Sequence, residues 1–254
     1  MIYPCFNGLH GHPPLITRKC FPAIVAWDRP GGLRAVLQEF RADIQEVDVV
    51  DQAVMMDMDT PDDYQRIIAY LARQDLPTAE ECEALLRHLQ TPIKVVRHGE
   101  AVAATAVIMA EHLNKNGYKL DEKLVRVGGL LHDIGKGSSD HAAAGADILT
   151  KLGYLPAAEI VRRHMDLGMM TGLDEAAVVY LADKIIAGDQ LVPLSRRFAK
   201  AKDRFAGQPE ILSLVDRRLA TARLIKQKIE DVLGLSDIGE ILPKGGIAHG
   251  NGLY

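Results

Sequence analysis

The segment LVRVGGLLHDIGK, residues 124–136, joins an apolar helical pattern to a polar end. Its valines and leucines recur at three- and four-residue steps, which is typical of a helix that packs on other helices. His132 and Asp133 close this helix, and Gly135 ends it. The segment therefore predicts a core helix that finishes in an imidazole and a carboxylate.

Helical periodicity extends in both directions from this segment. It begins at Thr78, and glycine or proline marks most of the joints. The helical segments expected are residues 78–89, 93–115, 121–133, 141–152, 156–165, 174–187 and 210–233. The sequence thus predicts a mainly α protein, with an all-α helical bundle over most of its length.

The first 76 residues have a different pattern. The apolar run 21–27 and the β-branched run 47–58 alternate with helical signals at 32–42 and from Thr60 onward, which favours a small α/β segment. Residues 74–78, QDLPT, end one helix and cap the next. The domains expected are an α/β segment over residues 1–76, a helical domain over 77–235 and a flexible tail over 236–254.

Composition excludes several classes of protein. The chain has 254 residues, of which 48% are hydrophobic and 25% charged, so it is long enough for two folded domains and is not a disordered chain. A net charge of -4 disfavours nucleic-acid and membrane partners. No membrane span or signal peptide is evident, and three scattered cysteines (Cys5, Cys20 and Cys82) fit free thiols in a reducing compartment. A cytoplasmic location is expected.

Other titratable groups fall on apolar helix faces. His98 shares a face with Val95 and Val102, and Asp183 lies four residues after Val179. Each group alone fits packing equally well, as a hydrogen-bonded core histidine or an aspartate paired with lysine or arginine. Three inward-facing groups on three helices, with imidazole and carboxylate but no thiolate, favour a catalytic site for Fe, Mn, Co, Ni or Zn.

These residues carry a resemblance to a known family. Over about residues 93–190 the chain resembles the HD superfamily of metal-dependent phosphohydrolases, whose H…HD…D pattern is matched in order by His98, His132, Asp133 and Asp183. LLHDIGKG followed by H-x-x-x-GA from His141 strengthens the likeness. The chain is most similar to HD families with two extra histidines, and among them to the dinucleoside-polyphosphate hydrolases. The GYP motif of the cyclic-dinucleotide phosphodiesterases is absent.

The resemblance implies a ligand set and a chemistry. His98, His132, Asp133 and Asp183 would be the core metal ligands, and His141 and His164 would hold a second ion with Asp133 as the bridge. Two divalent ions are expected, iron or manganese or else Mg, Co, Ni or Zn, and they would activate water for attack on phosphorus. Asp133 and Lys136 are the expected catalytic residues.

Basic residues near these ligands are candidates for binding phosphate. Lys136, Lys184, Arg163 and Arg197 are the substrate-binding candidates; each also fits a solvated surface residue, as does Arg162. Residues 195–230 are strongly basic, which fits a solvated helix face or a route for an anionic substrate. Residues 168–172 and the segment after Gly188 are expected to set specificity.

A second resemblance concerns the amino-terminal segment. GHPPLI (11–16), GGLRAVL (31–37) and DMDTPDDY (57–64) are similar to the carboxy-terminal half of a molybdenum-cofactor nucleotidyltransferase, which implies that Asp57 or Asp59 lies near magnesium. The same residues also fit a helix start capped by Thr60. The family's glycine-rich nucleotide loop is absent, so we expect a fragment or remnant without transferase activity. Exposed strand edges in a half domain would permit a homodimer.

The leading hypothesis is a metal-dependent phosphohydrolase for a nucleotide-type phosphate ester or anhydride, with a small phosphorylated molecule as its partner. The alternative is a non-catalytic nucleotide-binding regulatory module fused to a molybdenum-cofactor nucleotidyltransferase. A third possibility is a bifunctional enzyme in which the helical domain trims or proofreads the transferase product.

Overall fold

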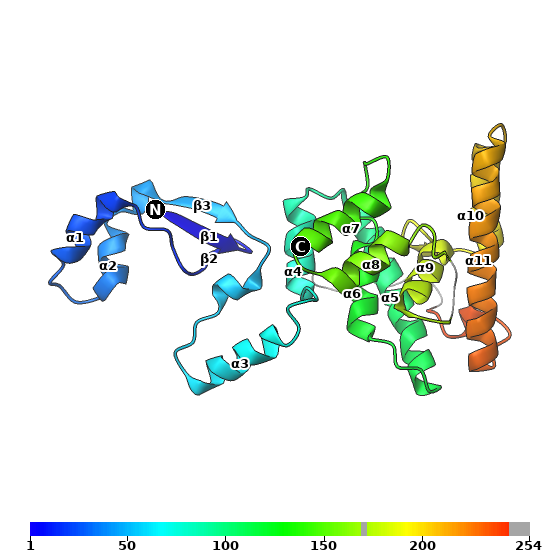
Figure 1. Ribbon diagram of the computed structural model, residues 1–254, viewed down its shortest axis with the longest axis horizontal. Coiled ribbons are helices and arrows are strands. Elements are labelled where there is room, and N and C mark those ends of the chain that lie inside the picture. Colours follow the sequence, from blue (N-terminus) through cyan, green and yellow to red (C-terminus); the bar gives the residue numbers. More distant parts are fainter. Residues whose placement is uncertain (169–171, 244–254) are drawn as a thin grey trace. The chain divides into compact units, whose positions relative to one another are not determined.

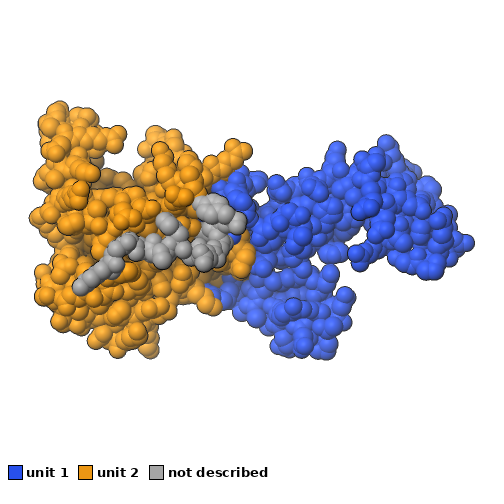
Figure 2. Space-filling view, turned by 180° about the vertical axis from the view of Figure 1, so that it is seen from behind, with its two compact units in different colours: residues 1–73, 83–89 blue, residues 74–82, 90–254 orange. Residues whose placement is uncertain are grey.

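The computed structural model of the chain describes residues 1–168 and 172–243. Figure 1 traces its helices and strands. The chain divides into two compact units: unit 1 comprises residues 1–73 and 83–89, and unit 2 comprises residues 74–82 and 90–254 (Figure 2).

Unit 2 is built from helices. The helices are α4 (Ala79–His88), α5 (Ile93–Lys115), α6 (Glu122–Leu131), α7 (His141–Lys151), α8 (Leu155–Arg163), α9 (Glu175–Ile185), α10 (Leu194–Arg204) and α11 (Pro209–Leu233). Helix α4 has residues in both units. A short hairpin follows α9, formed by β4 (Ile186–Ala187) and β5 (Gln190–Leu191). The predicted mainly α fold is confirmed.

The buried centre of unit 2 is α9. Every residue of this helix from Ala176 to Ile185 is buried, including Asp183 and Lys184. A helix that is apolar on nearly all sides must be surrounded by other elements. Residues of α5, α6, α8, α10 and α11 complete the same hydrophobic cluster around it. The core of the bundle therefore fixes the backbone that carries Asp183.

The carboxy-terminal part of unit 2 differs from the expectation in two places. Helix α10 was not among the expected helices, whereas α11 matches the helix expected over residues 210–233, with Pro209 in its first turn. Residues 236–243, assigned above to a flexible tail, contain a 3-10 helix (Ile238–Glu240), and Ile238 and Leu242 are buried in the core. The rest of the expected tail, 244–254, lies outside the described residues.

Unit 1 contains a three-stranded sheet with the order β2-β1-β3. Its elements are β1 (Ile2–Phe6), β2 (Leu9–His10), α1 (Phe21–Val25), α2 (Gly32–Gln38), β3 (Gln45–Asp48) and α3 (Pro61–Leu71). β1 pairs antiparallel with β2 and parallel with β3, as in an α/β unit with a helical crossover. A small core of Met1, Cys20, Val36 and Leu37 holds this unit together.

Unit 1 corrects several local expectations. The apolar run at 21–27 forms the short helix α1, because Pro22 at its start favours helix entry and not a strand. The strand expected over 47–58 is limited to β3, and residues 52–55 form a 3-10 turn capped by Asp51. The helix start at Thr60 is confirmed, with a capping box between Thr60 and Asp63.

Within residues 1–168 and 172–243, no helix combines the length and the apolar character needed to cross a bilayer.

Candidate metal centre

Five helices supply the predicted metal ligands. His98 lies in α5, and His132 and Asp133 follow the last residue of α6. His141 is the first residue of α7, and His164 follows the last residue of α8. Asp183 lies in the last turn of α9. Figure 1 shows these helices grouped in one half of unit 2.

Two glycines allow α5 and α6 to approach closely at this point. A Cβ on Gly99 would lie 2.6 Å from a carbonyl oxygen of α6, and a Cβ on Gly129 would lie 2.5 Å from the Cα of Ala103 in α5. Any larger side chain would force the helices apart. As a result, the rings of His98 and His132 lie with their centroids 5.1 Å apart.

A third glycine brings α7 against the turn after Asp133. A Cβ on Gly135 would lie 2.3 Å from the carbonyl oxygen of His141 and 2.5 Å from the amide nitrogen of Gly145. Asp140 caps α7 by accepting a hydrogen bond from a backbone amide in its first turn. The close approach and the cap together place His141 beside Asp133.

The donor atoms form two clusters. The first cluster comprises His98, His132 and Asp183, and the second comprises Asp133, His141 and His164; within each, one ligand atom per residue lies within 4.8 Å of the others. In the first cluster, Oδ1 of Asp183 is 3.1 Å from Nε2 of His98 and 3.7 Å from Nε2 of His132. Each cluster therefore presents imidazole nitrogen and carboxylate oxygen to one point.

Asp133 lies between the two clusters. Its Oδ1 is 3.5 Å from Nε2 of His141 and 3.8 Å from Nε2 of His164. Its Oδ2 is 3.7 Å from Nε2 of His132 in the first cluster. The carboxylate thus directs one oxygen toward each cluster, which is the arrangement of a bridging ligand.

Backbone carbonyls orient three of the imidazoles. Nδ1 of His98 lies 2.7 Å from the carbonyl oxygen of Gly188, Nδ1 of His132 lies 2.8 Å from that of Gly129, and Nδ1 of His164 lies 2.6 Å from a carbonyl of α8. Since a carbonyl oxygen only accepts, each Nδ1 donates to its carbonyl, and this hydrogen bond turns each Nε2 toward the clusters. Metal-binding histidines are typically held in this way.

The donor set fits a metal ion. Nε2 of His132 is completely buried and has no hydrogen-bond partner in the part of the chain that the structure describes. Nε2 of His164 faces Nε2 of His141 at 3.2 Å, within hydrogen-bond distance. A buried acceptor without a donor is costly, and a cation would satisfy it.

The ionisation states of these residues also favour the binding of a metal ion. Burial lowers the pKa of His132 below its ordinary value and lowers that of His164 to about 3. Burial alone would raise the pKa of Asp133 and Asp183, but their neighbours, His132 and the hydrogen-bonded Lys136 for Asp133 and chiefly Lys184 for Asp183, bring both below the usual value. At neutral pH these pKa shifts leave His132 and His164 neutral and Asp133 and Asp183 charged, the forms that bind metal.

Three of the predicted phosphate-binding residues lie at the clusters. Lys136 is hydrogen-bonded to Asp133, and its side chain is half exposed. Lys184 is buried and donates to Asp183 and to a backbone carbonyl, so it supports the ligands and does not face solvent as a substrate contact would. Arg197 reaches Asp183 at 3.4 Å and also donates to the carbonyl of Ile186.

Other candidates are not brought to the clusters. Arg163 pairs with Asp174 at 3.1 Å and with Glu159, and Arg162 pairs with an exposed aspartate of α7. None of these partners is a predicted ligand. Residues 169–171 of the loop expected to set specificity lie outside the described residues.

The amino-terminal aspartates are exposed. Asp57 lies 3.7 Å from Nε2 of His12, and both side chains are open to solvent. Among the residues that the structure describes, no group of three possible metal ligands includes Asp57 or Asp59. The structure therefore does not gather them into a metal site.

Comparison with known proteins assigns the family. A family model described as HD domain matches residues 95–188, which include all residues of both clusters. An uncharacterized protein of Methanocaldococcus jannaschii is 31% identical over 156 residues, covering 54% of this chain and 92% of the relative. The chain belongs to the HD-domain family. HD domains are typical of metal-dependent hydrolases.

A second relative is similar to this HD-domain chain over only part of its own length. A tRNA (cytidine(56)-2'-O)-methyltransferase of Picrophilus torridus is 29% identical over 148 residues, which is 51% of this chain but only 42% of that enzyme. No solved structure matches the chain. The chain therefore spans less than half of that relative, and the methyltransferase name is a property of the relative.

Sequence reasoning missed the backbone groups that orient the imidazoles. The carbonyls of Gly129 and Gly188 have no side-chain signal, and only the fold brings Gly188 to His98. The sequence allowed Asp183 to pair with a lysine or arginine but did not identify Lys184 as the partner, although its position directly after Asp183 on a fully apolar helix could have indicated this buried ion pair.

Proposed function

We propose that this HD-domain chain is a metal-dependent phosphohydrolase that cleaves a phosphate ester or anhydride of a nucleotide-type substrate. The observation that carries the proposal is the pair of clusters joined by Asp133, with the unpartnered Nε2 of His132 directed into them. Imidazole and carboxylate without thiolate are typical of catalytic sites for divalent cations with positions open to water.

Each cluster would hold one divalent cation, iron or manganese or else magnesium, cobalt, nickel or zinc. A cation bound there would acidify a water molecule and polarise a phosphoryl oxygen. The protein would contribute rigidity, because the hydrogen bonds from Nδ1 to backbone carbonyls and the buried position of α9 fix the ligands before any cation arrives.

Lys136 would be the residue that contacts substrate. Its side chain is half exposed while its ammonium group lies against Asp133, so it is placed between the clusters and solvent. A lysine at this position would bind a phosphoryl oxygen and offset the charge that develops there in the transition state. Lys184 and Arg197 would act as positioning residues, since both contact Asp183.

The proposal is tested by metal content and hydrolysis together. Protein purified without chelator or nickel resin is analysed for metal and assayed with p-nitrophenyl phosphate and with dinucleotides. We expect about two iron or manganese ions per chain together with turnover. Asp133→Ala should lose both, because it removes the bridging carboxylate.

A matched control is Asp147→Ala, which removes an exposed α7 carboxylate that pairs with Arg162 and belongs to neither cluster. It should keep the metal and the turnover of the wild type. Full activity in Asp133→Ala would contradict the proposal.

A specific observation favours a second candidate, a nucleotide-binding regulatory module fused to a molybdenum-cofactor nucleotidyltransferase. Both cluster carboxylates are paired with cationic side chains, Asp133 with Lys136 and Asp183 with Lys184, so their charge is neutralised without a metal. Calorimetry with nucleotides before and after treatment with a chelator separates the two candidates. Unchanged binding without metal, and no turnover with any divalent ion, would support the regulatory module.

A further inference from the structure

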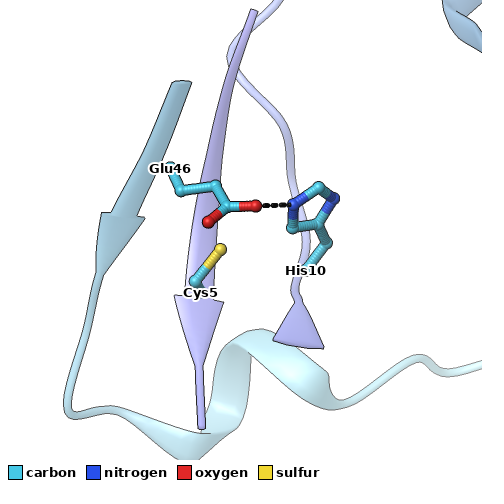
Figure 3. A group of neighbouring side chains, drawn as sticks. All are labelled: Cys5, His10 and Glu46. Atoms are coloured by element: carbon cyan, nitrogen blue, oxygen red, sulfur yellow. Dashed lines mark hydrogen bonds and ion pairs between the residues drawn. The ribbon is translucent and has the colours of Figure 1, made fainter. Parts of the chain in front are cut away.

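Unit 1 contains a group of possible metal ligands that is separate from the HD clusters. Sγ of Cys5, a ring nitrogen of His10 and a carboxylate oxygen of Glu46 all lie within 4.8 Å of one another (Figure 3). Each residue comes from a different strand of the sheet, β1, β2 and β3 respectively.

A tight hairpin fixes the first pair of ligands. Asn7 and Gly8 connect β1 to β2 with φ values of 53° and 77°, as expected for the two-residue turn that Asn-Gly favours. The turn sets the register in which Cys5 lies directly opposite His10. Residues opposite each other in an antiparallel pair project from the same face of the sheet.

The parallel strand β3 supplies the third ligand to this face. Tyr3 pairs in register with Glu46, and Tyr3 lies two residues before Cys5 on β1. Because side chains alternate along a strand, Tyr3 and Cys5 share one face, and Glu46 joins them from the neighbouring strand. The central strand therefore carries the cysteine, and each flanking strand carries one further ligand.

The donor atoms are already turned toward one another. Nε2 of His10 lies 2.7 Å from Oε1 of Glu46, and Figure 3 shows the sulfur of Cys5 directed toward the same carboxylate. The ring of Tyr3 stacks on the imidazole with centroids 4.5 Å apart and planes at 18°, which fixes the orientation of His10.

We propose that Cys5, His10 and Glu46 bind a divalent cation of the zinc class. Thiolate, imidazole and carboxylate are the three ligand types of protein zinc sites, with bonds of about 2.0–2.3 Å that place the donor atoms roughly 3.3–3.6 Å apart. The side chains of His10 and Glu46 are 38% and 62% exposed, so both have the freedom to make this small adjustment around the buried Cys5. Three protein ligands leave one position for water.

The local charge favours a cation. Asp48 lies opposite Cys5 on β3, so two carboxylates of β3 flank the thiol. A divalent ion would offset the charges of the thiolate and Glu46. The sulfur ligand favours zinc over magnesium.

Sulfur makes this site distinguishable from the HD clusters. Neither cluster contains a cysteine. Cys20 is buried in the small core of unit 1, and Cys82 is fully buried in α4. A spectroscopic signal from a bond between sulfur and metal therefore reports on Cys5, whether or not the HD clusters hold metal.

The test is a cobalt titration of the reduced, full-length, chelator-treated protein. We expect a near-ultraviolet charge-transfer band from thiolate to Co²⁺ that saturates with one sulfur-bound ion per chain and is removed by zinc. Cys5→Ser should abolish the band, and Glu46→Gln and His10→Gln should weaken cobalt binding by roughly 10–100-fold or more. Cys20→Ser is the matched control and should keep the band.

The variants also separate this proposal from the phosphohydrolase proposal. Asp133→Ala should keep the sulfur band even if it loses the metal of the HD clusters. The proposal is overturned if the wild type gives no band, if the band survives in Cys5→Ser, or if Glu46→Gln leaves cobalt binding unchanged. Because Glu46 is exposed, its variant tests the site even if Cys5→Ser fails to fold.

Discussion

Replacing Gly129 by alanine should push α6 away from α5 and weaken metal binding at the first cluster. The new Cβ would lie 2.5 Å from the Cα, 2.8 Å from the backbone nitrogen and 2.9 Å from the Cβ of Ala103. All three are atoms of, or directly attached to, the backbone of α5. No flexible side chain can move aside to accommodate the methyl group, so the helices themselves must separate.

The separation can be estimated from these contacts. Carbon atoms pack at about 3.5–4.0 Å, so the helices must move apart by roughly 1 Å at this point. Overpacking of this kind costs about 1–3 kcal/mol of unfolding free energy. Since α5 carries His98 and α6 leads into His132, the two ligands separate by a similar amount. Metal sites tolerate only about 0.2 Å, so we expect metal affinity to fall roughly 10–100-fold.

Urea unfolding and chelator competition measure the two effects separately. Gly207→Ala is the matched control, because a Cβ at Gly207 would meet no atom within 4 Å. It should leave both the unfolding free energy and the metal affinity close to the wild-type values. If Gly129→Ala binds metal as tightly as Gly207→Ala, the close approach of α5 and α6 is not what positions the ligands, and the reasoning fails.

Three further predictions concern charge and capping. Lys184→Met should destabilise the metal-free protein by about 3 kcal/mol in urea unfolding, because it removes the buried ammonium beside Asp183 and leaves this carboxylate only its contacts with His98 and Arg197, and added metal should reduce the loss. Thr60→Ala removes the cap of α3 and should cost about 1 kcal/mol of unfolding free energy, whereas an unchanged value would rule out a role for the cap. Hydrogen bonding to Thr60 lowers the pKa of Asp63 from 3.8 to about 2, so its stabilisation is present above pH 4 and lost as the pH falls toward 2. Unfolding free energies measured against pH should fall less between pH 4 and pH 2 in Asp63→Asn than in the wild type.

The helical domain could be predicted from sequence because burial imposes a period on the residues. The pattern predicted a helix over 93–115, and α5 has those bounds. His98 and Asp183 were placed inward because they share spacing with valines and isoleucines, and both are buried. Where a helix has one clear apolar face, the same spacing that predicts the helix also predicts which polar groups lie inside.

Unit 1 was harder to predict because its elements are too short for a period to emerge. α1 has five residues and β2 has two, so neither completes a pattern. The group of Cys5, His10 and Glu46 was missed for the same reason, since Glu46 reaches the others only through strand pairing. The Asn7-Gly8 pair was the available signal, because it predicts a hairpin that sets Cys5 against His10.

The buried helix α9 has a consequence for the kinetics of metal exchange. Asp183 belongs to this helix, and with His98 and His132 it forms a cluster whose side chains are at most 10% exposed. In the second cluster, the side chain of His141 is 25% exposed. We therefore expect ions to enter and leave past His141, so that an ion at the second cluster equilibrates quickly with solvent. An ion beside Asp183 would have a long residence time, and brief dialysis against a chelator would leave the protein half-loaded.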